Sequence, residues 1–169
     1  MLVGGTGSDK LWGDAGNDVL YTNYDPDEDS TLPDSGDADF ASGGSGNDLL
    51  YGFESNSGPG REEHLFGGTG NDELHAYRGD DYLHGGEGHD LLFGGFGVDE
   101  LRGGAGDDRL EGSRGNDTLF GGTGEDLILA GREDDDAYGG EGDDIILGQQ
   151  GNDDLFGGEG DDRLYGNQA

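Results

Sequence analysis

An acidic side chain recurs every nine residues along most of this 169-residue chain, behind a fixed pattern of glycines. The stretch GGEGHDLLF, residues 85–93, shows the unit: glycine at positions 1, 2 and 4, aspartate at position 6 and leucine at position 8. Sixteen units align in this way, and position 6 is acidic in every one. Carboxylates and the carbonyls of a glycine turn offer only oxygen ligands, and the chain has no cysteine and no regularly placed histidine. This donor set favours calcium over magnesium or zinc.

The candidate metal ligands are therefore the acidic residues at position 6. In one unit this residue is Glu63, whose longer side chain departs from the pattern. The other units carry Asp9, Asp18, Asp39, Asp48, Asp72, Asp81, Asp90, Asp99, Asp108, Asp117, Asp126, Asp135, Asp144, Asp153 and Asp162.

The rest of the unit predicts the elements that position these aspartates. Glycine allows positive φ and close approach of another backbone, so GGxGx predicts a tight turn, and the glycine density excludes helix. Positions 7 to 9 predict a short strand in which only position 8, Leu or Ile in fourteen units, points inward. Two units facing each other can pair these residues and stack on the next pair. We therefore predict an all-β, right-handed parallel β-roll, a β-solenoid with two nonapeptides, about 18 residues, per turn.

Stacking at about 4.8 Å places the aspartates in two rows along a roll on the order of 40 Å long. One row would carry Asp81, Asp99, Asp117, Asp135 and Asp153, and the other Asp72, Asp90, Asp108, Asp126, Asp144 and Asp162. Like charges in line are destabilising unless a cation lies between them. The predicted fold therefore requires a counter-ion.

A single solenoid domain is expected to cover residues 1–169. Two polar stretches interrupt the repeat and predict surface loops, at residues 22–33 and 52–57. From residue 58 to residue 165 the units follow one another without insertion.

The composition limits the partners. Forty acidic and eight basic residues give a formal net charge of −32, which disfavours nucleic acid and anionic membrane surfaces and favours cations. No apolar run reaches the roughly 18 residues of a transmembrane segment, and the first residues offer no signal-peptide core.

The repeats resemble those of the repeats-in-toxin (RTX) family, whose nonapeptide GGxGxDxUx forms a calcium-loaded parallel β-roll. The resemblance implies that each ion lies between turns two units apart, so that Asp90 shares ions with Asp72 and Asp108. It also implies up to about 14 ions, with weaker or missing ions at the units that begin at Asp34, Gly58 and Ala130. The turn carbonyls implied as further ligands are those of Gly67, Gly85, Gly94, Gly103, Gly121, Gly139 and Gly157.

The family also implies a role. Its members are exported from calcium-poor bacterial cytoplasm by one-step, type I-like systems and fold outside the cell. We therefore expect a secreted, calcium-induced folding and secretion module of a larger polypeptide. The alternative is a stand-alone extracellular protein that is adhesive or binds carbohydrate or ice.

Other features favour structural roles. The outward aromatic residues at position 9, such as Tyr51 and Phe93, could form a binding ladder or support self-association, as could the ends of the roll, but cross-strand stabilisation is favoured. The threonines are too scattered for an ice-binding face, the four histidines do not form a zinc site, and residues 25–30 begin like an EF-hand loop without its glycine. No catalytic motif is present, so no enzyme activity is expected.

Overall fold

The computed structural model of the chain describes residues 1–4, 8–22, 38–52 and 60–166. Within these ranges the backbone forms seventeen β-strands and no helix. The strands are β1 (Leu2–Val3), β2 (Lys10–Trp12), β3 (Val19–Tyr21), β4 (Asp39–Ser45), β5 (Leu49–Tyr51), β6 (Glu63–Thr69), β7 (Glu73–Arg78), β8 (Tyr82–Glu87), β9 (Leu91–Phe96), β10 (Glu100–Ala105), β11 (Arg109–Arg114), β12 (Thr118–Thr123), β13 (Leu127–Arg132), β14 (Asp136–Glu141), β15 (Ile145–Gln150), β16 (Asp154–Glu159) and β17 (Arg163–Tyr165).

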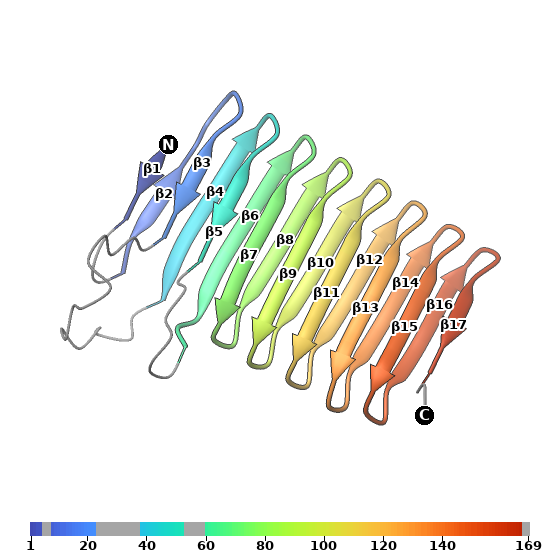
Figure 1. Ribbon diagram of the computed structural model, residues 1–169. Helices are drawn as coiled ribbons and strands as arrows, with labels where there is room; N and C mark the ends of the chain where they lie inside the picture. Colours follow the sequence, from blue (N-terminus) through green and yellow to red (C-terminus); the bar gives the residue numbers. More distant parts are fainter. Residues whose placement is uncertain (5–7, 23–37, 53–59, 167–169) are drawn as a thin grey trace.

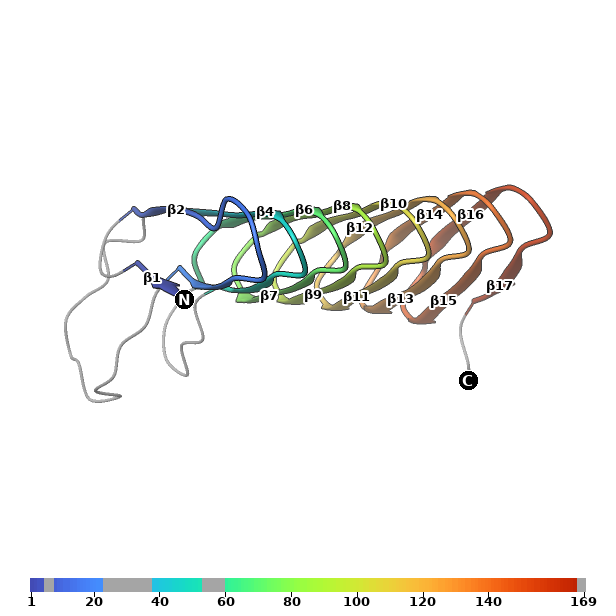
Figure 2. The ribbon, with the colours of Figure 1, turned by 90° about the horizontal axis from the view of Figure 1, so that it is seen from above.

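The strands alternate between two sheets. The odd-numbered strands form a nine-stranded sheet from β1 to β17, and the even-numbered strands form an eight-stranded sheet from β2 to β16 (Figure 1). Seen from above, the two sheets are the two layers of one continuous coil (Figure 2). All pairings are parallel, and Leu101 of β10 lies opposite Leu119 of β12, 18 residues further along the chain. The predicted parallel β-solenoid with 18 residues per turn is thus confirmed.

Two turns of the coil are longer than the others. Leu11 pairs with Ala41, and in the same turn the Asp9 N–H bonds to Asp39 across a separation of 30 residues. The corresponding separation from Asp48 to Asp72 is 24 residues. Thr22 and Gly52, where the two predicted loops begin, still donate ladder hydrogen bonds to the carbonyls of Tyr51 and His75. The remainder of both predicted loops, 23–33 and 53–57, lies outside the described residues.

The strands are longer than the sequence predicted. From β7 to β16 each contains six residues, which are positions 7, 8 and 9 of one unit and positions 1, 2 and 3 of the next. The first two glycines therefore lie in a strand, and only positions 4 to 6 form the turn. The expectation of a GGxGx turn was wrong because the same glycines of neighbouring turns pair with each other, as Gly104 does with Gly122. Glycine lets these backbones meet at φ values such as +122° for Gly104.

The core lies between the sheets and follows a period of two. Along β6 the inward, buried positions alternate with half-buried ones, and the inward set contains positions 6, 8 and 1. Position 8 supplies the leucine column expected from the sequence, and Ala76 and Ala130 add methyl groups at position 1. The buried apolar residues are Leu11, Leu20, Ala41, Leu50, Leu65, Leu74, Ala76, Leu83, Leu92, Leu101, Leu110, Leu119, Ile128, Ala130, Ala137 and Ile146.

Aromatic rings stack along the outside of both sheets. On the odd-numbered sheet, the ring centroids of His75 and Phe93 lie 4.6 Å apart. On the even-numbered sheet, Tyr138 stacks on Phe120 at 5.0 Å and on Phe156 at 4.8 Å. These contacts join side chains of adjacent strands, the arrangement that stabilises a sheet.

The turn glycines at position 4 are expected to resist substitution. Gly88 has a φ of +136°, and a Cβ added there would lie against the Gly70 carbonyl of the preceding turn. We predict that Gly88→Ala lowers the free energy of unfolding by about 1–3 kcal/mol. Gly166→Ala is the matched control, because a Cβ at Gly166 meets nothing within 4 Å. Chemical denaturation of both variants in saturating calcium measures the difference, and equal midpoints would contradict the role assigned to Gly88.

Candidate metal centre

The acidic residues of position 6 form two columns, one along each edge of the coil. We call the column at the edge where the even-numbered strands begin the first carboxylate column. It contains Asp9, Asp39, Glu63, Asp81, Asp99, Asp117, Asp135 and Asp153. The second carboxylate column lies where the odd-numbered strands begin and contains Asp18, Asp48, Asp72, Asp90, Asp108, Asp126, Asp144 and Asp162. Each acid directly precedes a strand or, as with Asp39 and Glu63, is its first residue, so the pleat of that strand turns its side chain inward.

One oxygen of most of these carboxylates accepts a hydrogen bond from the backbone of the preceding turn. The N–H of Asp72 donates to Oδ1 of Asp90 at 2.8 Å, and the N–H of Asp90 donates to Oδ1 of Asp108 at 2.8 Å. The same bond recurs along both columns at 2.7 to 3.3 Å. These bonds fix each carboxylate between consecutive turns of the coil.

The second oxygen is buried without a hydrogen-bond partner among the described residues. This holds for Oδ2 of Asp9, Asp48, Asp72, Asp81, Asp90, Asp99, Asp108, Asp117, Asp126, Asp135, Asp144 and Asp153. A carboxylate oxygen removed from water without a partner is costly, and a charged one more so. A row of such atoms therefore indicates that something beyond the protein completes their coordination.

Backbone carbonyls lie close to these oxygens in the even-numbered sheet. A Cβ built on Gly85 would contact both Oδ2 of Asp90 and the carbonyl oxygen of Gly103 in the next turn. A Cβ built on Gly67, Gly103, Gly121 or Gly139 would likewise contact an aspartate Oδ2 and a glycine carbonyl of the next turn. These carbonyls belong, in the same order, to Gly85, Gly121, Gly139 and Gly157. The two other glycines expected to supply carbonyls, Gly67 in β6 and Gly94 in β9, also stand at position 1 of their units. The structure thus brings carboxylate and carbonyl oxygens together, as the oxygen-only donor set requires.

Within the described ranges, no three His, Cys, Asp or Glu side chains converge on one point. An ion at either edge would therefore combine carboxylates of adjacent turns with carbonyl oxygens. Such oxygen donors suit calcium, which accepts six to eight oxygens in flexible geometry. The residues present fit that ion.

Burial raises the pKa of the carboxyl groups in the middle of both columns. The pKa of Asp99 rises to about 8 because burial removes water from the charged form, and the carboxylates of Asp81 and Asp117 raise it further. The same desolvation brings the pKa to about 7 at Asp108 and Asp135, and to about 6 at Asp72, Asp81, Asp117 and Asp126. Hydrogen bonds from the backbone oppose the shift in each case. Without a cation, the columns are therefore poorly suited to carry their full charge at neutral pH.

These shifts give the calcium-free roll an unusual pH dependence. Between the ordinary aspartate pKa near 4 and the raised values of about 6 to 8, the folded chain binds more protons than the unfolded chain. The stability of the calcium-free fold therefore rises as the pH falls from 8 to 5. We expect far-UV circular dichroism of protein stripped of calcium to show more strand at pH 5 than at pH 8. Equal or lower strand content at pH 5 would contradict this prediction.

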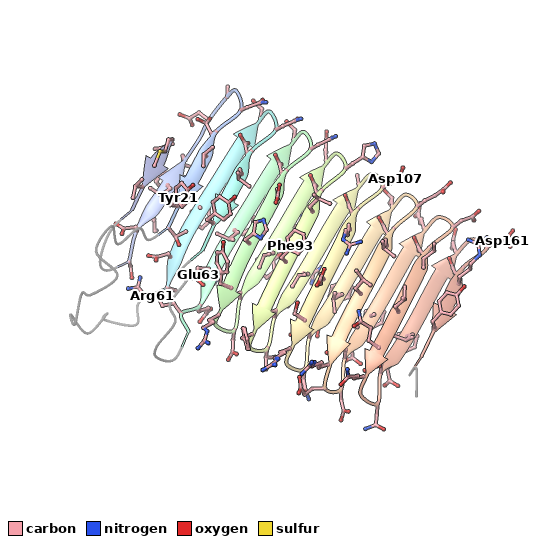
Figure 3. All side chains as sticks on the ribbon, viewed as in Figure 1. Tyr21, Arg61, Glu63, Phe93, Asp107 and Asp161 are labelled. Atoms are coloured by element: carbon pink, nitrogen blue, oxygen red, sulfur yellow. The ribbon has the colours of Figure 1, made fainter. Side chains whose placement is uncertain are left out.

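A second ladder, which the sequence did not reveal, follows the tips of the turns at position 5. The N–H of Glu125 donates to Oδ1 of Asp107 at 2.9 Å, and the N–H of Asp161 donates to Oδ1 of Asp143 at 2.9 Å. Asp107 and Asp161 are labelled in Figure 3, at the edge of the coil where the odd-numbered strands begin. Asn and Asp are common at position 5, where both residues tolerate the left-handed region of a tight turn. Their recurrence there was the available signal for this ladder.

One regular turn bond is replaced at Glu133, which stands at position 4 in place of glycine. Its backbone adopts a φ of +75°, and its Oε2 accepts from the N–H of Gly115 at 3.1 Å. In the neighbouring turn, the N–H of Gly97 donates to the backbone carbonyl of Arg114. The side chain of Glu133 thus accepts a hydrogen bond that a strand carbonyl accepts elsewhere. The weaker ion expected at this unit stays a prediction.

A parallel solenoid edged by two columns of inward-facing carboxylates defines a cation-binding β-roll. The sequence pattern of the RTX calcium-binding nonapeptide repeat matches residues 1–23, 34–56, 66–101, 93–128, 102–137 and 138–168. The chain therefore belongs to the RTX calcium-binding nonapeptide repeat family and is a calcium-binding β-roll repeat domain. No individual curated protein matches it. The described residues also contain no helix with the length and apolar character needed to cross a membrane.

Proposed function

We propose that this roll is a calcium-loaded folding module of a secreted protein. Each pair of neighbouring acids in a column holds one ion between consecutive turns, so that Asp72 and Asp90 share one and Asp90 and Asp108 share the next. Turn carbonyls, including those of Gly85 and Gly103, supply further oxygens. Eight acids in each column leave seven gaps, about 14 sites in all.

The row of buried Oδ2 atoms without a protein partner is the observation that supports this proposal most strongly. An ion in each gap turns these oxygens from an energetic cost into ligands. About 14 calcium ions would bring roughly +28 of charge against the −32 of the chain. The charge of the chain and the number of gaps therefore agree.

The role in export rests on the calcium requirement. A ligand that binds only the folded chain supplies folding free energy, so the chain stays unfolded where calcium is scarce and folds where it is plentiful. RTX repeats are typical of secreted bacterial proteins. We infer that this chain leaves the cell unfolded and folds outside as part of a larger polypeptide.

Isothermal titration calorimetry and equilibrium dialysis with calcium test the proposal. We expect about 14 ions per chain, cooperative uptake and a matching gain of strand, with magnesium at the same concentration producing neither. Asp108→Asn, in the middle of the second column, should remove one or two ions, whereas Asp107→Asn, its exposed neighbour, should remove none. Absence of calcium uptake by the unsubstituted chain at millimolar concentrations would refute the proposal.

A further inference from the structure

One cation is already built into the first carboxylate column. Arg61 occupies position 4 of its unit, where thirteen of the sixteen units have glycine, and only 3% of its surface is exposed. Its Nη1 lies 3.1 Å from Oδ2 of Asp39, and the two side chains are 2% and 0% exposed. An arginine enclosed to this degree is rare unless it is paired.

The column departs from its regular pattern at this point. In the other turns that are followed by a further acid of the column, the N–H of the aspartate donates to the carboxylate of the next turn, as from Asp9 to Asp39. The N–H of Asp39 instead donates to the backbone carbonyl of Glu62 at 3.3 Å. The ladder resumes one turn later, where the N–H of Glu63 donates to Oδ1 of Asp81 at 2.8 Å. The interruption therefore lies in the single gap between Asp39 and Glu63.

The path of the backbone through the turn is otherwise preserved. The N–H of Arg61 donates to the carbonyl of Arg78 at 3.1 Å, just as the N–H of Gly70 donates to Glu87 in a regular turn. Arg61 and Glu63 are labelled in Figure 3 at the edge where β4 and β6 begin. The side chain is thus placed on the column by a turn that keeps its normal position in the coil.

Two further carboxylates of the column act on the guanidinium. Burial lowers the pKa of Arg61, and the carboxylates of Glu63 and Asp9 oppose that shift. An arginine stays protonated under such conditions, so a permanent positive charge lies among Asp9, Asp39 and Glu63. Glu63 is itself fully buried. The guanidinium thus contacts Asp39 directly and interacts electrostatically with two further members of the column.

We propose that Arg61 is an internal counter-ion that takes the place of one calcium ion, in the gap between Asp39 and Glu63 of the first carboxylate column. The inference rests on the proposed function and refines it: of the about 14 gaps, one is assigned to the guanidinium and the other gaps, about 13, to calcium. That gap then needs no calcium ion of its own, although the roll as a whole still depends on calcium in the other gaps.

The test compares calcium stoichiometry in matched variants. Arg61→Gly combined with Glu63→Asp restores the regular glycine and aspartate of the repeat, and Glu63→Asp alone keeps the arginine. We expect the double variant to bind one more calcium ion per chain than Glu63→Asp, by equilibrium dialysis and metal analysis of the folded protein. Glu63→Asp combined with Arg132→Gln is the charge control, because Arg132 is exposed, and it should bind the same number of ions as Glu63→Asp.

Two results would overturn the inference. The first is equal stoichiometry in the double variant and Glu63→Asp, and the second is failure of the double variant to gain strand in excess calcium, since the inference requires calcium to replace the guanidinium. Both results leave calcium binding by the unsubstituted chain intact. Failure of the proposed function is distinguishable because it would abolish calcium uptake in the unsubstituted chain as well.

Discussion

Removal of calcium at pH 8 is expected to unfold the roll along its whole length. The two columns then carry buried carboxylates whose pKa burial raises, to about 8 at Asp99 and about 7 at Asp108 and Asp135, so folding must either protonate them or bury unpaired charge. The net charge of −32 adds repulsion that opposes any compact state. Far-UV circular dichroism in chelator should show a disordered chain, and size-exclusion chromatography should show an expanded one.

Two controls separate calcium binding from charge screening. Potassium chloride at the ionic strength of the calcium buffer, and magnesium at the calcium concentration, should leave the chain disordered. Return of excess calcium should restore the strand signal. The same strand content in chelator as in excess calcium would show that the fold does not depend on the ion.

The second large effect is expected from the core column. Leu101 is fully buried at the centre of the even-numbered sheet, between Leu83 and Leu119 of the adjacent turns. Leu101→Ala removes three carbons and leaves a cavity, so we expect it to lower the free energy of unfolding in saturating calcium by about 2–5 kcal/mol.

Leu164→Ala is the matched control for this substitution. Leu164 occupies position 8 of the last strand, β17, and is 42% exposed. Its loss should cost less than about 1 kcal/mol. Urea denaturation of both variants in calcium gives the comparison, and equal losses at Leu101 and Leu164 would contradict a core that forms between stacked turns.

The repeat itself made most of this architecture predictable. Position 8 is Leu or Ile in fourteen of sixteen units, so the inward position of each unit can be identified despite hydrophobic residues at other positions. One apolar residue in nine cannot form a core within a single unit, so two units must face each other in each turn. The inward turn of the aspartates follows from the same period, because position 6 lies two residues before position 8. The placement of the position 6 acids in two columns was therefore correct.

Strand length could not be predicted in the same way. Glycine has a low strand propensity, so the pairing of Gly104 with Gly122 is decided by the neighbouring turn rather than by the local sequence. β1 was missed although Leu2 lies nine residues before Leu11, which was a usable signal. Arg61 could be recognised as a departure from the repeat, but its ion pair with Asp39 depends on the coil bringing residues 22 positions apart together.

The contact of each turn with only its neighbours has a mechanical consequence. A force applied at the C-terminal end would detach β17 from β15 and β16 from β14 without loading the turns behind them, so the roll should yield one turn at a time. Each 18-residue turn would release about 60 Å of extended chain. If each gap holds a cation between the acids of two turns, as proposed, the ions would leave in the same order. The strength of each step would then report the cation held in that gap.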